Sequence, residues 1–407
     1  MIKVFKKILM HSWRLLKLEY SGYSRKKIIS KSTRVKLVNE SQQGEIVFTV
    51  KNAGIEKIPL SYVIEHIEGG EIAFQSPQID LKNYSNAIVF AKSDFIIIGD
   101  KAIWHKSSMP QFTKFIPADK YLLDYQNDTL YIDKPCKIID IKNGFSLCGV
   151  HSNTWAHFLV QYFPKIDYIE KLLNIINDEL TIIVPVYKDH QIKEIINAYC
   201  NKVNRLNIVE LQDDEIACCK NLYHIENLSF ISDHADYLSP SDLIVPNMVV
   251  LFLKEKFLSN IHLFPSSLNY SSSKKRKLFI VRSGYRNILN IDEIEVFFRS
   301  EGFEFINPQD YSLDEKRMIF QEALIIVGPG SSGFTNAIFC KPGTIILAFV
   351  NFQRIYDLYM SSIVRMFDLR FFLLTGTDIN PASPHSAFFI PIEKIKKEYY
   401  SIINSQN

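Results

Sequence analysis

The stretch Lys277 to Phe349 decides the fold; it opens KLFIVRSGYRNILN and closes ALIIVGPGSSGFTNAIFCKPGTIILAF. Its short apolar runs alternate with helical segments, which is typical of a parallel sheet wound by helices. Arg282 and Arg286 follow one apolar run, and the turn Gly328 to Gly333 follows another and opens a helix. Both features fall at the carboxyl ends of strands, where open α/β sheets bind ligands. Because a helix N-terminus attracts anions, the sequence predicts a nucleotide or phosphate site.

Several residues of this edge are candidates for contact with the anion. They are Arg282, Arg286, Gly328, Gly330, Ser331, Ser332, Gly333 and Asn336. Alternatively, the arginines form salt bridges with Asp292 or Glu293, the glycines only permit a tight turn, and Asn336 only holds the loop. A P-loop is excluded because no Lys-Ser or Lys-Thr pair follows the glycines. A nicotinamide fingerprint is excluded because the loop comes late in its domain.

A second cluster of polar side chains lies in the stretch Gly149 to Pro164, GVHSNTWAHFLVQYFP. Its apolar residues recur at helical spacing and form one face, with Ser152 or Asn153 as the N-cap. The opposite face carries Thr154, His157 and Gln161. His157 is a candidate general base, because the dipole of a helix keeps an imidazole in its first turn neutral. The alternative is a capping or core-edge histidine without a chemical role.

Composition limits the class of protein. The chain has 407 residues, of which 47% are hydrophobic and 22% charged, enough for two globular domains with ordinary cores. The net charge of +3 with scattered basic residues argues against nucleic-acid binding. The six cysteines have neither zinc-site nor secreted-framework spacing, so we expect reduced thiols and a cytoplasmic location.

The N-terminus has the pattern of an amphipathic basic helix. No apolar run reaches the ~18 to 20 residues that span a bilayer, and the segment lacks the cleavage site of a signal peptide. Ile2, Phe5, Ile8, Leu9, Trp13 and Leu16 recur at helical spacing among lysines and arginines. Two interpretations stay open: a surface anchor on the anionic inner face of the cell membrane, or a helix packed on the domain with solvated lysines.

Changes in the pattern of apolar and polar residues along the chain predict its domains. Short β-rich runs precede alternating strands and helices, and a Ser/Asn-rich stretch separates these from the C-terminal domain. We predict a basic segment at 1–30, a β-rich plus α/β domain at 31–245, an interdomain helix and linker at 246–276, a C-terminal α/β domain at 277–385 and a final helix at 386–407.

Across about 145–375 the chain resembles glycosyltransferase family 61, which includes capsular polysaccharide enzymes. The resemblance rests on an ordered set of motif residues: Arg282, Arg286, Asn290, Asp292, Glu293, Phe320, Ala323, the glycine turn, Phe339, Pro342, Gly343 and Thr344. The family's Asn-aromatic-x-His-aromatic-Leu segment is matched at His157, and the Leu-Pro-Arg that follows it is matched at Pro164. The chain departs from the family pattern at Gly330-Ser331-Ser332, at Thr154, at Lys165 in place of arginine and at Lys316 in place of glutamine.

The resemblance implies a fold and an activity. The fold is the GT-B arrangement, in which two Rossmann-like domains face a cleft, here with a β-rich N-terminal region. The activity is an inverting transfer of a hexose or pentose from a nucleotide sugar to a glycan or glycolipid acceptor, in capsular or lipopolysaccharide synthesis. The arginines and glycine turn would bind the donor diphosphate, His157 would be the base, and Asn153, Thr154 and Gln161 would lie on the acceptor side.

No metal or other cofactor is expected, because Arg side chains and helix N–H groups can replace a cation at the diphosphate. The Asp-x-Asp motif of metal-using glycosyltransferases does not occur in the sequence, and Asp213-Asp214-Glu215 has the form of a solvated acidic turn. Two other functions stay open: a non-catalytic glycan- or nucleotide-binding subunit of the same fold, and a protein O-glycosyltransferase.

Overall fold

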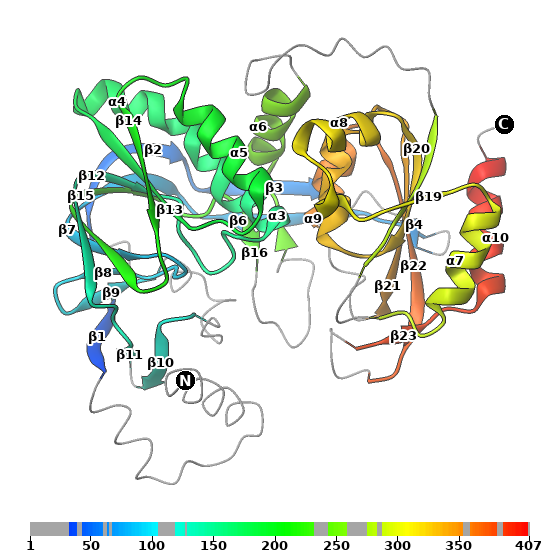
Figure 1. The fold of residues 1–407 in the computed structure, drawn as a ribbon, viewed down its shortest axis with the longest axis horizontal. Coiled ribbons are helices and arrows are strands. Elements are labelled where there is room, and N and C mark those ends of the chain that lie inside the picture. The colour runs from blue at the N-terminus through cyan, green and yellow to red at the C-terminus, as the bar shows by residue number, and fades with distance from the viewer. Residues whose placement is uncertain are drawn as a thin grey trace, which may run out of the picture.

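A computed structural model describes residues 32–38, 43–59, 63–64, 67–104, 119–126, 128–231, 243–258, 275–282, 287–352, 359–380 and 386–405. The fold is mixed α/β, as the sequence predicts. Its main strands form two large sheets, one in each half of the molecule (Figure 1). The segment 1–30 and Arg286 lie outside the described residues, so their predicted roles stay predictions.

The first sheet joins the β-rich region and the first α/β region into one layer. Its strand order is β10-β11-β1-β9-β8-β7-β15-β12-β13-β14, with β2 also paired to β7. The strands from the β-rich region are β1 (Thr33–Val38), β2 (Glu45–Lys51), β7 (Ile79–Phe90), β8 (Ile96–Ile98), β9 (Lys101–Ile103), β10 (Leu122–Gln126) and β11 (Thr129–Ile132). The mutually parallel strands are β12 (Lys137–Ser146), β13 (Leu180–Pro185), β14 (Leu206–Leu211) and β15 (Glu215–Ile225).

The helical connection from β12 to β13 is irregular. It consists of α3 (Trp155–His157), the π-helix η3 (Phe158–Tyr162), the 3₁₀ helix η4 (Phe163–Tyr168) and α4 (Ile169–Ile176). Pro164 lies in the first turn of η4, where the missing N–H and fixed φ of proline are tolerated. The next connection, from β13 to β14, is the helix α5 (His190–Cys200), which is capped by the Asp189 side chain.

The second sheet contains the strands of the stretch Lys277 to Phe349. Its parallel strands run in the order β19-β18-β20-β21-β22, which is a doubly wound order with a switch point between β18 and β20. The strands are β18 (Arg276–Ile280), β19 (Glu304–Ile306), β20 (Ala323–Pro329), β21 (Ile345–Asn351) and β22 (Arg370–Asp378), with the short β23 (Phe388–Phe389) antiparallel to β22.

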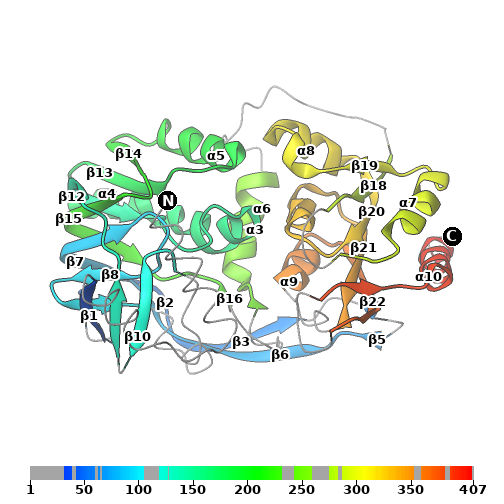
Figure 2. The same ribbon diagram turned by 60° about the horizontal axis from the view of Figure 1, so that its bottom comes forward.

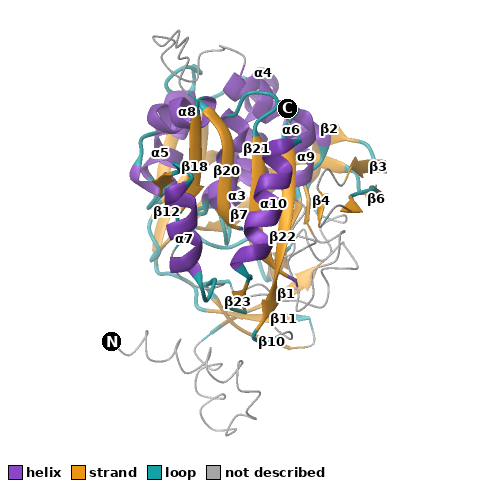
Figure 3. Ribbon diagram, turned by 90° about the vertical axis from the view of Figure 1, so that its right-hand side faces the viewer, coloured by secondary structure: helices purple, strands orange, loops and turns teal. Residues whose placement is uncertain are grey.

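Alternate residues of these strands bury opposite faces of the sheet. One face packs beneath α7 (Ile291–Ser300) and α10 (Ile392–Asn404), both seen in front of the sheet in Figure 3. The other face packs beneath α8 (Leu313–Gln321), the 3₁₀ helix η7 (Ser332–Phe339) and α9 (Tyr359–Met366). The short 3₁₀ helix η6 (Pro308–Asp310) leads into α8. Apolar residues therefore recur along each strand without the polar alternation of a half-exposed sheet.

A two-stranded arm from the N-terminal region reaches the second sheet. The antiparallel strands β3 (Gly54–Pro59) and β6 (Glu71–Ser76) run between the two halves (Figure 2). At the far end, β4 (Val63–Ile64) pairs with β5 (Ile67–Glu68) and adds in parallel to β22. Residues within the predicted first domain, 31–245, thus extend the second sheet. The sequence analysis missed this pairing, which joins strands far apart along the chain.

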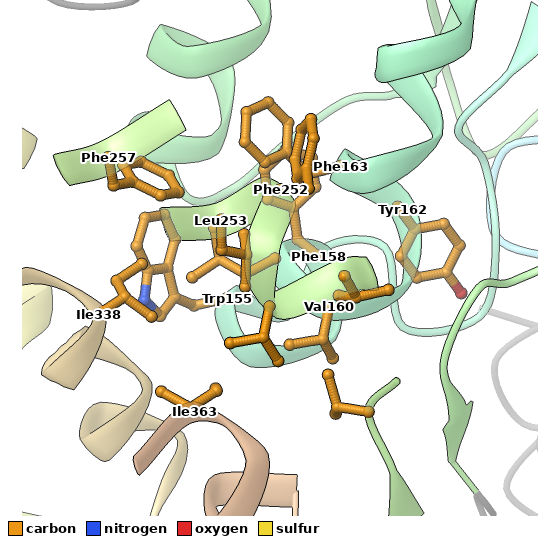
Figure 4. Close-up of a cluster of buried hydrophobic side chains, with 14 of the residues drawn as sticks. Trp155, Phe158, Val160, Tyr162, Phe163, Phe252, Leu253, Phe257, Ile338 and Ile363 are labelled. Atoms are coloured by element: carbon orange, nitrogen blue, oxygen red, sulfur yellow. The ribbon is translucent and has the colours of Figure 1, made fainter. Parts of the chain in front are cut away.

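Helix α6 (Asn247–Leu258) forms the centre of the contact between the halves. It packs on η3 and η4 of the first half and on η7 and α9 of the second. Figure 4 shows Phe252, Leu253 and Phe257 of α6 lying among Phe158 and Phe163 and, across the contact, Ile338. The ring of Phe257 meets that of Phe339 edge-on at 5.3 Å between centroids, so one hydrophobic core spans both halves. The small strands β16 (Phe230–Ile231) and β17 (Leu243–Ile244) precede α6.

Because both halves share this core, we expect the protein to unfold in one cooperative transition. Phe257→Ala should lower the free energy of unfolding by about 3–5 kcal/mol, since it leaves a cavity in the shared core. Leu251→Ala is the matched control: this α6 side chain is 54% exposed, and its loss should cost within about 0.5 kcal/mol. Calorimetry that resolved two transitions, with only one moved by Phe257→Ala, would contradict a shared core.

Candidate active site

The structure brings the two motifs of the C-terminal stretch together at the switch point of the second sheet. Arg282 follows β18 and Gly330 follows β20, and these two strands are neighbours. The Nη1 group of Arg282 donates a hydrogen bond to the main-chain carbonyl oxygen of Gly330. The guanidinium is therefore held against the glycine loop, and no described ion pair joins it to Asp292 or Glu293.

Close packing explains why glycine occupies three positions of the loop. A Cβ on Gly328, where φ is +151°, would lie 2.6 Å from the carbonyl oxygen of Ile280. A Cβ on Gly330 would lie 2.9 Å from Val350, and one on Gly333 2.9 Å from the Ile280 side chain. The loop can approach β18 and β21 this closely only without side chains. These contacts account for the glycines even without a ligand.

Helix η7, which the loop opens, is a 3₁₀ helix. Ser331 is its N-cap residue, with extended backbone and no capping bond from its side chain, and Ser332 beside it is exposed. Asn336 is 0% exposed, and its Nδ2 donates to the carbonyl oxygen of Gly333 at 2.8 Å. Asn336 therefore braces the loop from a buried position, and its contact with a donor stays a prediction.

His157 lies at the end of α3 and is oriented by a buried neighbour. Its Nδ1 is 2.7 Å from Oε1 of Gln161, and because an amide oxygen only accepts, Nδ1 carries the proton. The lone pair of the neutral ring is then on Nε2, the tautomer that a base acting through Nε2 requires.

The predicted acceptor-side residues do not share one environment. Gln161 is 1% exposed but bonds to His157, so the two share one side of the helix as predicted, while the amide of Gln161 is covered from solvent. The helix is irregular at this point, because in the π-turn of η3 Phe163 N–H bonds to Phe158 across five residues. Thr154 is exposed and Asn153 half-buried, just before α3.

His151 is a site residue that the sequence analysis did not select. Its ring stacks on that of His157, with 4.6 Å between centroids and 30° between planes. The only sequence signal is a second histidine six residues before the first, which alone carries little information.

The two candidate regions meet across the contact between the halves. Helix α3, which carries His157, packs against η7, which the glycine loop opens. The helix that carries His157 therefore lies beside the helix that the glycine loop opens, and the latter is in the same protein half as Arg282 and its bond to Gly330. This combination suits proton transfer next to an anionic group.

Two neighbouring carboxyl groups, of the half-buried Asp94 and the buried Asp119, lie near the loop that leads into α3. The Tyr162 hydroxyl donates to Asp94 at 3.2 Å, and a Cβ on Gly149 would lie 2.5 Å from the same carboxylate. Asp119 is buried and accepts the Tyr121 N–H at 2.8 Å. Burial, together with the charge of the neighbouring Asp94, raises the pKa of Asp119 to about 7 against the lowering effect of the hydrogen bond from Ser93. This pair could not be recognised in the sequence, because Asp94 and Asp119 are distant along the chain from Tyr162.

Three further expectations concern the cysteines, metal sites and membrane-spanning helices. The six cysteines are free thiols. Within the described ranges, no three His, Cys, Asp or Glu side chains gather as they would around a metal ion; metal independence stays a prediction. No described helix is long and apolar enough to cross a membrane.

Comparison with known families gives one match. Residues 155–347 match the model of the family described as glycosyltransferase 61. The match begins at α3 and ends within β21, so it contains His157, Arg282 and the glycine loop, whereas Asn153 and Thr154 precede it. The resemblance drawn from the sequence is confirmed over this segment, and it supports glycosyltransferase activity; a capsular subtype stays a prediction. No curated protein matches the chain.

The raised pKa of Asp119 predicts how the folding stability of the protein changes with pH. Between pH 3.8 and about 7 the folded protein keeps a proton that the unfolded chain has lost, so stability falls as the pH rises through this window. Asp119→Asn removes the charge but keeps an oxygen for the Tyr121 N–H. The variant should be more stable than wild type at pH 8, by up to roughly 4 kcal/mol, with the gain vanishing near pH 4.

Urea unfolding at pH 4, 6 and 8 measures this difference. Asp133→Asn, at an exposed position after β11, is the control and should follow the pH dependence of wild type. A gain for Asp119→Asn that is equal at all three pH values would mean that the charge of Asp119 is not its source.

Proposed function

We propose that the chain is an inverting glycosyltransferase that moves a sugar from a nucleotide sugar to a glycan or glycolipid acceptor. The observation that carries the proposal is the contact between Arg282 and the Gly330 loop at a sheet switch point, inside the segment that matches glycosyltransferase 61. Surface polysaccharide assembly, capsular or lipopolysaccharide, is the pathway that we propose. The transferred sugar is a hexose or a pentose.

In this proposal the second half binds the donor. The diphosphate lies at the carboxyl ends of β18 and β20, where Arg282 and the first N–H groups of η7 face developing negative charge. Because Gly330 holds the guanidinium in place, little reorganisation is needed as the leaving group departs. These groups take the part of a metal ion, and the reaction proceeds without one.

The first half binds the acceptor and supplies the base, as in a GT-B arrangement. The acceptor hydroxyl oxygen attacks the anomeric carbon from the face opposite the diphosphate. A new carbon–oxygen bond forms as the bond to the phosphate oxygen breaks, and the nucleoside diphosphate leaves with the electron pair. The hydroxyl proton passes to Nε2 of His157, whose Nδ1–H is held by Gln161. Configuration at the anomeric carbon is inverted by this single displacement.

We further propose that the enzyme works at the cytoplasmic face of the cell membrane. The amphipathic basic segment at 1–30 motivates this location, because lysines and arginines on one helix face attract anionic lipid headgroups. The acceptor would then be a glycan carried on a lipid at the same surface.

Single substitutions should separate donor binding from chemistry. Arg282→Ala should weaken donor affinity and slow transfer, since a lost charge-assisted contact typically costs ~1.5 to 3 kcal/mol. His157→Ala should leave donor affinity nearly intact and lower turnover by about 100-fold or more. Donor affinity by calorimetry, turnover by mass-detected transfer and melting temperature are measured for each variant, after a panel of nucleotide sugars has identified the donor.

Matched controls are an exposed histidine and an exposed arginine. His190→Ala, at the start of α5, and Arg299→Ala, on α7, should change neither turnover nor donor affinity. A well-folded His157→Ala protein with normal turnover would remove the base assignment. Binding without transfer or hydrolysis for every donor would favour a non-catalytic subunit.

Metal removal tests the proposed stabilisation of the leaving group. Transfer should persist in excess EDTA, because Arg282 and the η7 N–H groups replace a cation at the diphosphate. Activity is compared before and after chelation and again after added Mg²⁺ or Mn²⁺. Complete loss of transfer in EDTA, with recovery on adding either ion, would contradict this mechanism, because a metal ion would then be stabilising the diphosphate.

A further inference from the structure

Lys316 is an unusual residue of the second half. It lies on α8 and is only 2% exposed. Burying an ammonium group away from water is costly unless other groups replace its hydration. Among the described residues, no carboxylate lies within ion-pair distance of Lys316, so its charge is stabilised by other means.

Two residues of the first half provide that stabilisation. The Nζ group of Lys316 donates to Oε1 of Gln191 on α5 and lies 4.4 Å from the ring centroid of Trp155, the first residue of α3. A cation over an indole face at this distance is favourable, and more so when desolvated. Lys316 therefore contacts both α3 and α5 across the contact between the halves.

Gln191 also bonds back to the second half. Its Nε2 donates to the main-chain carbonyl oxygen of Tyr311, just before α8. Both bonding partners occupy fixed positions: Gln191 is in the first turn of α5, capped by Asp189, and Lys316 follows the capping box of Ser312 and Glu315. Gln191 thus accepts one hydrogen bond from the second half and donates another to it, and these two bonds form a bridge between the capped starts of α5 and α8.

The bridge is placed to control the position of His157. Trp155 is two residues before His157 on α3, and α3 also packs against η7. A displacement of Trp155 moves the histidine relative to the glycine loop. In a reaction that depends on alignment, a shift of about 1 Å can lower the rate about 100-fold.

We propose that Lys316, Gln191 and Trp155 form a clasp that positions His157 against the donor loop, with Lys316 as its positioning residue. The inference rests on the proposed function, because it assigns the clasp to the alignment of the base with the donor. Lys316 does not touch the substrate in this proposal; it acts through Trp155.

The charge of Lys316 gives the clasp a pH dependence. Burial lowers the pKa of Lys316 to about 8, against the raising effect of Asp189. Asp189 is the charged group that acts on Lys316, and nearby Glu194 of α5 interacts electrostatically with Asp314 of α8 and with His190. As the pH rises through about 8, the ammonium loses its proton and the attraction to the Trp155 ring, so the base should be held less well.

A rise in pH should have the opposite effect on folding stability from its effect on turnover. Between about pH 8 and 10.5 the unfolded chain binds a proton on Lys316 that the folded protein has lost. Folding stability therefore rises with pH in this window as far as this group is concerned. A lysine with only a structural role would not combine a gain in stability with a loss of turnover.

Three variants test the clasp through turnover, donor affinity and pH profile. Lys316→Met keeps the length and removes the charge; kcat should fall by roughly 10- to 100-fold at pH 7 with donor affinity unchanged, and the loss of activity near pH 8 should disappear. Gln191→Glu gives the lysine a carboxylate partner and should move this loss to higher pH. Arg317→Gln, the next residue along α8, is the matched control and should behave as wild type.

Hydrogen exchange of α3 provides a readout that does not depend on activity. The α3 amides should exchange faster in Lys316→Met than in wild type and the control. Unchanged exchange overturns the clasp, even if no donor is ever found and the proposed function fails. Normal kcat in a folded Lys316→Met protein overturns the positioning role. If that variant does not fold, a Gln191→Glu profile with no shift overturns the proposal.

Discussion

The burial of α6 between two sheets is the constraint on which the structure depends. A helix with apolar side chains on most of its surface is stable only when it is covered on several sides. Here η4 covers it from the first half and η7 and α9 from the second. Neither half alone completes the core around Phe257, so the two α/β layers and the helix between them form one hydrophobic unit.

This constraint limits how the halves can move. The arm that ends in β4 adds a strand to the second sheet, and Lys254 of α6 donates to the Met366 carbonyl at the end of α9 at 2.8 Å. A hinge that separated the halves would have to break these bonds and expose the shared core. We infer that substrates reach the site without such a separation.

The fold of the second half was predictable from sequence because its signal is local. Apolar runs such as Leu278–Ile280 are buried on both faces, and buried parallel strands appear in sequence as unbroken apolar runs. The positions of Arg282 and Gly330 then follow from the rule that parallel strands share a carboxyl edge. Their mutual hydrogen bond did not follow, since it depends on the order of the strands in the sheet.

The features that the sequence did not reveal arise from contacts distant along the chain or from departures from ideal helix geometry. The pairing of β4 with β22 joins residues more than 300 positions apart. A π-turn interrupts the helix at Phe158–Tyr162, and periodicity analysis assumes 3.6 residues per turn. Lys316 resembles any other lysine until its burial is known, because sequence position alone does not distinguish a solvated ammonium group from a buried one.

The polar groups of the site share one physical property: each is held by a partner that the fold has already fixed. Gln161 holds His157 from inside the core, and the main-chain carbonyl of Gly330 holds Arg282 at a turn too tight for side chains. Groups fixed in this way need little reorganisation when charge develops, and a nearby apolar core lowers the local dielectric and strengthens their effect. The stability that offsets the cost of holding polar groups in place comes from the aromatic core around α6. The contact that joins the halves is therefore also what keeps the site in order.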